Sequence, residues 1–579
     1  MKNTLLTTLF CLLFSTLQAL SQENSVYSYP QNYFGNPLNI PLILAGNFGE
    51  LRPNHFHAGI DIKTEGQEGL PVLAAAEGYV SRIKIEASGY GNALYITHPN
   101  GFTTVYAHLK SFNAAIATYV RQQQYQQQSF AIDITVPPNV LPVSKGAQIA
   151  LSGNTGASLA PHLHFEIRDT YSEKAINPLL FNFPIQDTRP PVIKSIYLYA
   201  YNRFYQKKMP PTEVSILRDK NGQYRCKGDT IRVDADYFGV AVNAFDQQNA
   251  ADNANGIYSI DLYEKELLCF EMEMHTFAFD ETRYLNAHID YAAYVEGKGM
   301  RHKCFSEAGD KLSMYGIRQN LGYIPLSPNE IVPIRLVLND VAGNQTEIRF
   351  FVQKKFSTVS NDTNHTNSAN GLPFCYYGTY NFYENDQIRV EFPPDVFYND
   401  MALAYFSENT ATSRFSAVHH IFDYTVPAHT YFNVSILPTR LPANLHEKAL
   451  IVLKQKGRTY PLTDSHWEGE YLSGKARGFG EFYVDIDTIA PAIKAASTYA
   501  NKKMSASSVM SFSISDNLSG IDTYNAYIDD AWTLASFDAK SASLKVTMPP
   551  ELNAGKHRFR LEVSDYCGNR QVLKFDFLR

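Results

Sequence analysis

The sequence predicts a mainly β protein, in which a domain built on antiparallel sheets is followed by β-sandwich domains. Three observations support this fold class. Tyrosine and phenylalanine are abundant, with 38 and 36 copies among 579 residues, and aromatic side chains suit the half-buried surface of a pleated sheet. Short apolar runs separated by glycine-containing turns fill residues 40–180, and two later segments repeat one pattern of turns.

The length of the chain limits the number of domains it can hold, and its charge limits the kinds of partner it can bind. At about 100–200 residues per domain, a chain of this length should hold three to five domains. Charged residues make up 19% of the chain, and the formal net charge is −6. Because binding to phosphates needs a concentrated excess of lysine and arginine, we expect no nucleic-acid partner.

The first residues are typical of a signal peptide, which we expect to span residues 1–21. Lys2 supplies the positive start, an apolar stretch runs from Leu5 to Leu17, and the small residues Ala19 and Ser21 offer cleavage sites. The stretch is shorter than the ~20 residues of a membrane-spanning helix, so we expect no transmembrane segment after signal removal. The alternative is an uncleaved anchor. The mature protein is expected to be exported, and to be periplasmic, outer-envelope-associated or secreted.

Five cysteines follow the expected signal: Cys226, Cys269, Cys304, Cys375 and Cys567. An exported protein can keep disulfides, but an odd number leaves at least one thiol free or paired with another molecule. The spacing does not decide which cysteines would pair. It also shows no close Cys-x-x-Cys pair that would indicate a cysteine zinc site.

The first domain is expected over residues 22–183, where turns and short apolar runs indicate a multistranded antiparallel sheet. The stretch from Ser111 to Gln128 breaks this pattern, because it is rich in alanine and glutamine and lacks glycine and proline. Such a composition favours a helix or a mobile excursion. We therefore place an insertion at about residues 111–141.

The remainder of the chain contains an internal repeat. The segment from Asp187 to Lys194 recurs from Asp487 to Lys494, and a matching turn closes each copy at Asp340–Asn344 and Asp565–Asn569. A Gly-Ile turn also follows Asp246 in the first copy and Asp516 in the second. These features predict immunoglobulin-like β-sandwiches at residues 187–355, with an insertion, and at residues 487–579. Turn chemistry explains the Asp and Asn residues, although such turns can also bind calcium.

Two segments separate the copies. Residues 356–370 are rich in serine, asparagine and threonine and are predicted to be a linker. Residues 371–486 are aromatic and β-like but match neither copy, so we assign them to a separate β domain of uncertain type.

Histidine-containing motifs concentrate within residues 55–166. His57 and Asp61 are four positions apart, so on one strand they would project from the same face, with Gly59 between them. His162 and His164 would likewise share one strand face. The other members of these motifs are Tyr106, His108, His55 and Glu166.

Several of these residues have structural explanations as well. Glu166 would orient a ligand histidine or end a strand in a salt bridge. Tyr106 would face the same way as His108, but a packed core tyrosine is the favoured interpretation. His55 is expected to be a solvated loop residue, and the pair His419-His420 has no partner at ligand spacing.

Two histidines and one aspartate form a donor set that suits zinc, which binds nitrogen and oxygen at about 2.0–2.2 Å in tetrahedral geometry. Catalytic sites keep three protein ligands and leave the fourth position to water. With neutral histidines such a site keeps a positive charge, which lowers the pKa of water and polarises a carbonyl.

Six motifs follow one another in the first domain: His57–Asp61, Pro71–Val80, Gly89–Asn92, Val105–Leu109, Gly153–Gly156 and Pro161–Ile167. In this order they resemble the lysostaphin-type zinc endopeptidases, also called the M23 or LytM family, over residues about 40–180. The resemblance implies an antiparallel-sheet LytM-type domain with one zinc ion held by His57, Asp61 and His164. It also implies two catalytic histidines that do not bind the metal, His108 and His162.

The family's activity then implies an endopeptidase that hydrolyses stem or bridge peptides of bacterial peptidoglycan. A zinc-bound water would attack the scissile carbonyl, while one histidine takes its proton and the other assists the intermediate or the leaving amine. Which histidine takes which part stays open. The resemblance also leaves open whether the insertion walls the substrate groove or holds it shut.

Two other functions compete with the enzyme. The first is a catalytically silent LytM-like module that binds cell wall or activates another wall hydrolase; the filled site positions favour the enzyme. The second makes the downstream domains an adhesin. Those β domains are also where an envelope protein partner would bind.

Overall fold

The computed structural model describes residues 29–355, 372–408 and 415–579, apart from residues 209, 229 and 506. The expected signal peptide and the expected linker at 356–370 lie outside the described residues. The mainly β fold class is confirmed, with antiparallel sheets in the first domain and further β domains after it. Among the described helices, none has the length and apolar character needed to cross a membrane.

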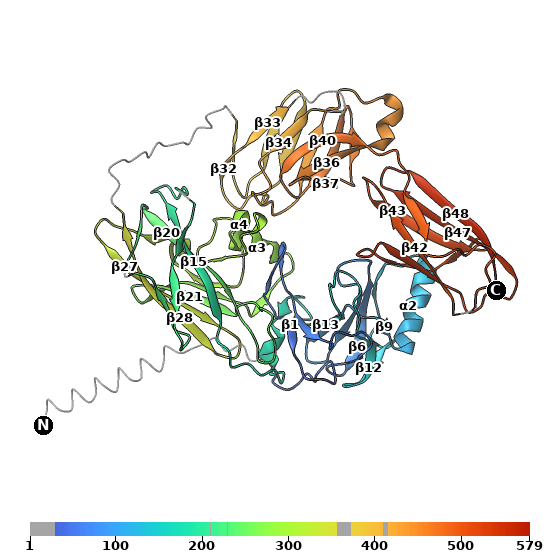
Figure 1. Cartoon of the computed structure of the whole chain (residues 1–579), viewed down its shortest axis with the longest axis horizontal. Coiled ribbons are helices and arrows are strands. Elements are labelled where there is room, and N and C mark those ends of the chain that lie inside the picture. The colour runs from blue at the N-terminus through green and yellow to red at the C-terminus, as the bar shows by residue number, and fades with distance from the viewer. Residues whose placement is uncertain (1–28, 209, 229, 356–371, 409–414, 506) are drawn as a thin grey trace.

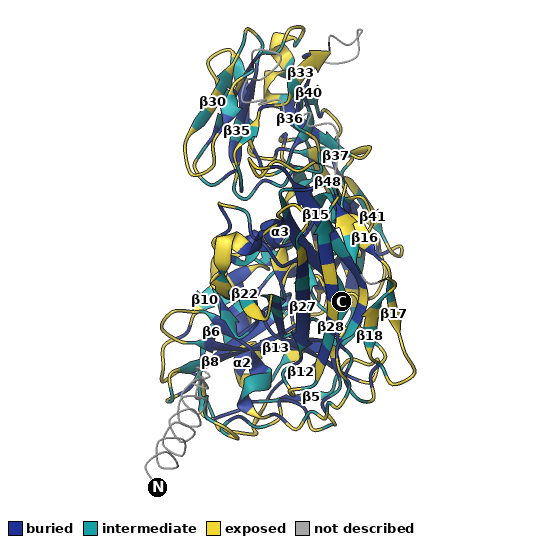
Figure 2. Cartoon of the chain, turned by 90° about the vertical axis from the view of Figure 1, so that its left-hand side faces the viewer, coloured by how far each residue is buried: buried dark blue, intermediate teal, exposed yellow. Residues whose placement is uncertain are grey.

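The first domain is built on one long antiparallel sheet. Its central strands are β4 (Ile60–Lys63), β13 (His162–Asp169) and β8 (Phe102–Ala107), which pair in that order. The sheet continues on both sides through β1 (Leu44–Gly46), β7 (Asn92–Thr97), β6 (Gly78–Ile85) and β10 (Ile132–Thr135). A smaller sheet of β5 (Pro71–Leu73), β12 (Gln148–Leu151) and β9 (Ser111–Phe112) accompanies it. Figure 2 shows that the residues of β13 and β8 are largely buried.

The insertion forms a helix and a strand. Helix α2 (Ala114–Gln127) begins at Asn113, whose side chain accepts a hydrogen bond from the Ile116 amide, and it ends at Gln128 in a left-handed conformation. Ile116 and Val120 anchor it to the domain core. The following strand β10 pairs with β6 at the sheet edge. Of the two forms that the composition allowed, the helix is the one observed.

The second domain has two large sheets and a two-stranded one, and it shares a core with the first domain. One sheet contains β15 (Val192–Tyr201) and β20 (Tyr237–Phe245), and the other contains β27 (Ile331–Asn339) and β28 (Gln345–Lys354). Strand β14 (Ala175–Ile176) of the first domain pairs with β23 (Thr276–Phe277) of the second. Phe48, Phe56 and Ala58 of the first domain belong to the hydrophobic core of the second. One continuous sheet therefore crosses the border that was expected between residues 183 and 187.

Part of the second domain reaches back to the histidine-rich region. Helices α3 (Leu285–His288) and α4 (Tyr291–Val295) lie in its insertion. Just before α3, the Thr282 hydroxyl accepts a hydrogen bond from the Phe56 amide at 2.8 Å. The Asn286 side chain donates to Asn54 at 3.0 Å. These contacts fix the short hairpin of β2 (Leu51–Arg52) and β3 (His55–Phe56) against the second domain.

The third and fourth domains each contain two larger antiparallel sheets, and the third has a further two-stranded sheet of β29 (Phe374–Cys375) and β32 (Met401–Ala402). Those of the third are centred on β35 (Phe432–Ile436) and on β40 (Gly480–Ile486), and those of the fourth on β42 (Val509–Ser515) and β47 (Lys556–Asp565). The fourth domain returns to lie beside α2 of the first (Figure 1). All five cysteines after the expected signal are free thiols. The described residues therefore contain no disulfide, which is why the cysteine spacing did not indicate a pairing.

Candidate metal centre and active site

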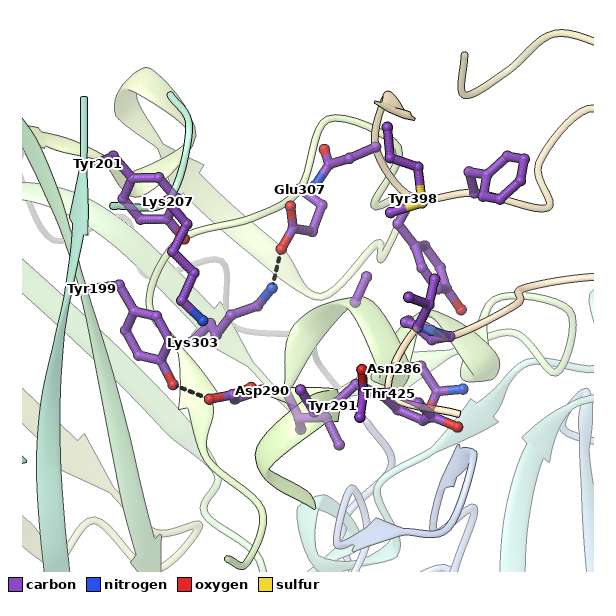
Figure 3. A pocket seen from close by; sticks show the side chains of 18 residues that line it. Tyr199, Tyr201, Lys207, Asn286, Asp290, Tyr291, Lys303, Glu307, Tyr398 and Thr425 are labelled. Atoms are coloured by element: carbon purple, nitrogen blue, oxygen red, sulfur yellow. Dashed lines mark hydrogen bonds and ion pairs between the residues drawn. The ribbon is translucent and has the colours of Figure 1, made fainter. Parts of the chain in front are cut away.

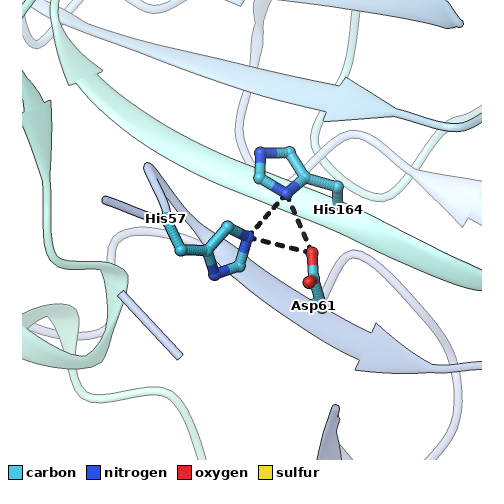
Figure 4. A group of neighbouring side chains, drawn as sticks. All are labelled: His57, Asp61 and His164. Carbon is cyan, nitrogen blue, oxygen red and sulfur yellow. Dashed lines mark hydrogen bonds and ion pairs between the residues drawn. The ribbon is translucent and has the colours of Figure 1, made fainter. Parts of the chain in front are cut away.

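Three side chains of the first domain converge on one point (Figure 4). His57 Nε2 lies 3.1 Å from Asp61 Oδ1, His164 Nδ1 lies 2.9 Å from the same oxygen, and the two nitrogens are 2.9 Å apart. All three side chains are buried. The structure thus brings together the three residues that the sequence nominated as metal ligands.

Strand pairing places two of the three residues. His164 on β13 is the direct cross-strand neighbour of Asp61 on β4. His57 arrives differently, because β3 ends at Phe56 and β4 begins only at Ile60. The expectation that His57 and Asp61 share one strand face is therefore wrong: a turn of the chain, not strand alternation, brings them together.

Gly59 makes this turn possible. A Cβ atom at this position would lie 2.3 Å from the carbonyl oxygen of Phe165 on β13, which is closer than real contacts allow. Only glycine lets the segment between β3 and β4 pack this tightly on β13. The same packing holds His57 over the strand that carries His164.

The far nitrogen of each ligand ring is occupied. His57 Nδ1 donates to the backbone carbonyl of Asn47 at 2.7 Å, and His164 Nε2 donates to Glu166 Oε1 at 2.8 Å. These bonds orient the rings, so that His57 Nε2 and His164 Nδ1 are the nitrogens that face the centre. Glu166 was expected to orient a histidine or to form a salt bridge, and it does both.

The salt bridge of Glu166 belongs to a buried network. Its Oε2 accepts hydrogen bonds from Arg168 at 2.6 Å, and its Oε1 also accepts one from the Tyr90 hydroxyl at 2.5 Å. Burial alone would raise the pKa of Glu166, but Arg168 and then His164 hold that pKa down to about 2. Glu166 is therefore ionised, and its negative charge supports the His164 ring.

The electrostatics of the centre favour a bound cation. Burial lowers the pKa of His57 to about 4. Burial acts in the same direction on His164, but its hydrogen bonds to Asp61 and Glu166 prevail and raise its pKa to about 9. Neighbouring histidines hold the pKa of Asp61 well below its usual range, although burial opposes them. These directions favour a positive charge, whether proton or metal ion, between these groups.

Arg52 forms a hydrogen bond with the second carboxylate oxygen of Asp61. Its Nη2 lies 2.5 Å from Asp61 Oδ2, while Asp61 Oδ1 faces the two histidines. Such a contact orients the carboxylate so that one oxygen points at the centre.

The two histidines nominated for catalysis lie beside the three ligands. The His108 and His162 rings are 4.8 Å apart between centroids. His108 Nδ1 donates to the Thr155 carbonyl at 2.9 Å, and His162 Nδ1 donates to the Ala160 carbonyl at 2.8 Å. His162 Nε2 lies 3.4 Å from Asp61 Oδ1 and is buried without a hydrogen-bond partner. Burial lowers the pKa of His108 to about 3.

Tyr106 does not share the direction of His108, which corrects the expectation from strand alternation. Strand β8 ends at Ala107, and His108 has a φ of 57°, so its side chain leaves the alternation of the strand. Tyr106 is fully buried, and its hydroxyl accepts a hydrogen bond from the Ala75 amide at 2.8 Å. It is the core tyrosine that the favoured interpretation described.

The other histidines hold structural positions. His55 is exposed on β3, and its Nδ1 donates to the Pro53 carbonyl at 2.8 Å. His419 is buried on β34 (Val418–Ile421) beside the Tyr405 hydroxyl, and His420 stacks on Phe406.

The donor set fits zinc. Ligands placed about 2.0 Å from a tetrahedral centre lie about 3.3 Å apart, close to the 2.9–3.1 Å separations of the three ligand atoms. Imidazole nitrogens with a carboxylate are ligands that zinc accepts. The unpartnered His162 Nε2 at the same point leaves a polar group facing the open side of the centre.

Sequence reasoning missed four supporting residues: Asn47, Arg52, Tyr90 and Arg168. Two of them had a signal. Tyr90 lies in the Gly89–Asn92 motif, and Arg168 is two positions from Glu166 on the same strand. Asn47 acts through its backbone carbonyl, and Arg52 through a hairpin contact, so their side-chain types gave no indication.

A separate cavity of about 200 Å³ lies between the second and third domains (Figure 3). Its polar groups are largely paired with each other. The Tyr199 hydroxyl donates to Asp290 at 2.5 Å, and Lys303 donates to Glu307. None of the five side chains of the candidate centre lines this cavity.

An antiparallel sheet that carries a His-Asp-His donor set and two further histidines defines a metallopeptidase-type domain. Residues 55–125 match the family model described as peptidase family M23, and this first domain belongs to that family. Residues 373–487 match a second model, described as a Zu5-like domain. That match coincides with the segment at 371–486, whose type the sequence pattern left uncertain.

Three curated relatives share the first domain. An uncharacterized metalloprotease of Haemophilus influenzae is 35% identical over 137 residues, which cover 24% of this chain and 22% of the relative. The DD-carboxypeptidase/endopeptidase Mpg of Neisseria meningitidis is 34% identical over 128 residues, or 22% of this chain and 23% of the relative. The murein hydrolase activator NlpD of Escherichia coli is 34% identical over 123 residues, or 21% and 25%. The match therefore spans about a quarter of each relative.

Proposed function

We propose that this protein is a zinc-dependent endopeptidase that cuts peptide cross-links of bacterial peptidoglycan. The observation that carries the proposal is the convergence of His57 Nε2, Asp61 Oδ1 and His164 Nδ1 within 2.9–3.1 Å of one another. Each ring has its far nitrogen engaged as a donor, so His57 Nε2 and His164 Nδ1 are the nitrogens that face the shared point. This arrangement supports a metal site, because a bound ion would replace the proton between these groups.

His57, Asp61 and His164 would hold the zinc ion. When bound, zinc supplies Lewis-acid polarisation of a carbonyl and lowers the pKa of water. His108 and His162 supply the proton chemistry, because each donates through Nδ1 to a backbone carbonyl. Each Nε2 therefore presents a lone pair, which can take a proton from an attacking water and return it to the leaving amine.

The curated relatives support the substrate class. One is named a DD-carboxypeptidase/endopeptidase and another a murein hydrolase activator. We therefore place the substrate among peptidoglycan stem or bridge peptides, and the protein in the cell envelope after export. An envelope protein partner would bind through the β domains.

A second candidate function follows from the activator relative: a silent module that binds cell wall or stimulates another wall hydrolase. The filled site favours the enzyme, because a silent module needs neither the ligand set nor the two further histidines. Arg52 at Asp61 does not block the centre, since it contacts Oδ2 and leaves Oδ1 facing the histidines.

The deciding experiment measures zinc content and peptide cleavage on the full chain. We expect about one zinc ion per chain, and mass spectrometry of a cross-linked muropeptide digest should reveal new amine and carboxyl ends. The matched control is His57→Ala, which should lose both zinc and cleavage. Zinc-free wild-type protein that releases no peptide but accelerates a partner amidase would establish the activator function instead.

A further inference from the structure

Two groups of three aspartates lie where the sandwich domains meet the domains that precede them. Asp187, Asp246 and Asp340 each offer one carboxylate oxygen within 4.8 Å of the others, and Asp487, Asp516 and Asp565 do the same. Asp187 and Asp487 open the two copies of the sequence repeat. The structure thus builds the same carboxylate triad twice.

The first triad lies on a cavity of about 190 Å³ at the junction with the peptidase domain. Residues of both domains line it: Asp187, Asp246 and Asp340 from the sandwich, and Asn47, Leu179 and Asn182 from the peptidase domain. The cavity is therefore a feature of the junction, and the carboxylates open into it.

Asp246 is the second, independent sign of a ligand. This residue is only 3% exposed, and its Oδ1 has no hydrogen-bond partner. A buried carboxylate oxygen without a partner costs far more free energy than a paired one. The other two carboxylates have local partners: Asp187 accepts from the Arg189 amide at 3.0 Å, and Asp340 accepts from the Asn344 amide at 2.8 Å.

No side-chain cation of the described residues balances this triad by direct contact. The guanidinium of Arg189, two residues from Asp187, donates to Gln247 at 2.5 Å and to the Ala251 carbonyl at 3.2 Å instead. Burial, followed by the charges of Asp187 and Asp340, raises the pKa of Asp246 to about 7.

The second triad repeats part of this arrangement. Asp487 and Asp565 are each 1% exposed, whereas Asp516 is half-buried, with its Oδ1 atom buried and without a hydrogen-bond partner. The neighbouring residues Leu518 and Cys567 pack on Val418, Leu450 and Tyr483 of the third domain. This triad therefore also lies at a junction with the domain that precedes it.

We propose that each triad binds one calcium ion, which clamps the sandwich to the domain before it. The metal-binding atoms of each triad are all oxygens. Hard cations prefer oxygen ligands, whereas an all-oxygen set does not suit zinc or copper. Three converging carboxylates, with room for water in the cavity, suit the flexible coordination of calcium better than the rigid octahedron of magnesium.

The first clamp lies next to a support of the zinc centre. Asn47 lines the same cavity, and its side chain exchanges two hydrogen bonds with the Gly256 backbone of the sandwich, at 2.9 and 2.7 Å. Its backbone carbonyl accepts from His57. Calcium at this junction would therefore steady the residue that orients a zinc ligand.

The test is calorimetric titration of the zinc-loaded full chain with calcium chloride in calcium-free buffer. We expect two sites in the wild type, one in Asp246→Asn, one in Asp516→Asn and none in the double variant. The matched control is Asp280→Asn, an exposed acid of the second domain, which should keep both sites. Absence of calcium binding by the wild type, or two sites remaining in the double variant, would overturn the proposal.

Thermal unfolding gives a second readout that a purely structural role would not produce. Without calcium, Asp246→Asn should unfold at the same or a higher temperature than the wild type, because the substitution removes repulsion within the triad. With calcium, only the wild type gains the full stabilisation that a bound ligand gives, so the order should reverse. Asp246→Asn less stable than the wild type in both buffers, with unchanged calcium response, contradicts the clamp.

Discussion

In each of the three candidate ligands, a hydrogen bond to the far atom of the side chain determines which atom faces the centre. The Asn47 carbonyl accepts a hydrogen bond from His57 Nδ1, Glu166 accepts one from His164 Nε2, and Arg52 donates one to Asp61 Oδ2. The site is thus oriented before any ion binds, which reduces the reorganisation that binding requires. The sequence nominated the three ligands, and their hydrogen-bond partners come from three different parts of the first domain.

His108→Ala and His162→Ala should separate catalysis from metal binding. Neither ring belongs to the His-Asp-His group, so zinc content should stay at the wild-type level. Loss of a proton-transferring histidine should lower kcat by about 10²–10⁴-fold. The measurements are zinc content and turnover of a cross-linked muropeptide, with His55→Ala as the exposed-histidine control. A variant that loses its zinc would show that the ring is a ligand.

Zinc binding should release about one proton per site near neutral pH. In the metal-free protein the pKa of His164 is raised to about 9, so this ring carries a proton that the metal must displace, whereas His57, with its pKa lowered to about 4, is already neutral. The apparent zinc affinity should therefore rise with pH up to about 9. Titration calorimetry in buffers of different ionisation enthalpy gives the proton count, and a count near zero or two would contradict this assignment.

Among the elements, the turn between β3 and β4 determines the centre as much as the strands do. Strand pairing sets Asp61 against His164, but His57 reaches them only because Gly59 packs against the Phe165 carbonyl. This dependence on one glycine gives the turn a role in metal binding.

Gly59→Ala should weaken zinc binding and destabilise the first domain. The added methyl group would force the turn away from β13, at a cost of about 1–3 kcal/mol, and would carry His57 away from His164. Chemical denaturation and zinc titration measure the two effects. Gly66→Ala is the matched control, because its φ of 73° makes the substitution strained while no atom lies within 4 Å of the added group. The control should lose stability but keep its zinc affinity; equal zinc affinity in both variants would contradict the role of the turn.

The limits of sequence prediction are visible in these same elements. Alternation placed His162 and His164 correctly, since both lie on β13. It failed for His57 and Asp61, and for Tyr106 and His108, because a turn and a left-handed residue interrupt the strands at those points. The candidate site residues were nominated from the order of the family motifs, so these two errors in alternation did not change the nomination. A period of two is reliable only within a strand, and strand ends are the least predictable part of the pattern.

At the scale of the whole molecule, the fourth domain lies on the loop that supports both non-ligand histidines. Lys540 donates to the carbonyls of Asn154 and Ser158, and Thr155 and Ala160 of the same loop accept from His108 and His162. The Tyr125 ring on α2 meets Trp532 at 5.3 Å between centroids. The helix of the insertion therefore contacts the fourth domain.

Lys540→Ala should lower turnover without changing zinc content. The substitution removes two charge-assisted hydrogen bonds that steady the loop, and we expect kcat to fall by about 3–10-fold, the equivalent of about 1 kcal/mol. Lys545→Ala, an exposed lysine on the neighbouring strand β46 (Ser543–Thr547), is the matched control. Turnover of the muropeptide substrate is the measurement. An increase in kcat would mean that the fourth domain restrains the site instead of supporting it.

The repeat in the sequence correctly indicated β domains after the first, but it gave no sign of how they meet. Turn chemistry explained the aspartates of each copy separately. Their convergence depends on Asp187, Asp246 and Asp340, which are far apart in the chain and meet only when the sheets close. Contacts between residues far apart in the chain cannot be predicted from a local sequence pattern. The contact of the fourth domain with α2 is another example.

The strand pair β14–β23 has a practical consequence for anyone who wishes to isolate the catalytic part. A fragment cut after residue 186 would expose the unpaired edge of β14 and leave Phe48 and Phe56 without the side chains that cover them. Bare strand edges and uncovered aromatic rings promote self-association. Proteolysis at this point would yield an aggregation-prone product, so a stable fragment that carries the candidate centre must include the first two domains.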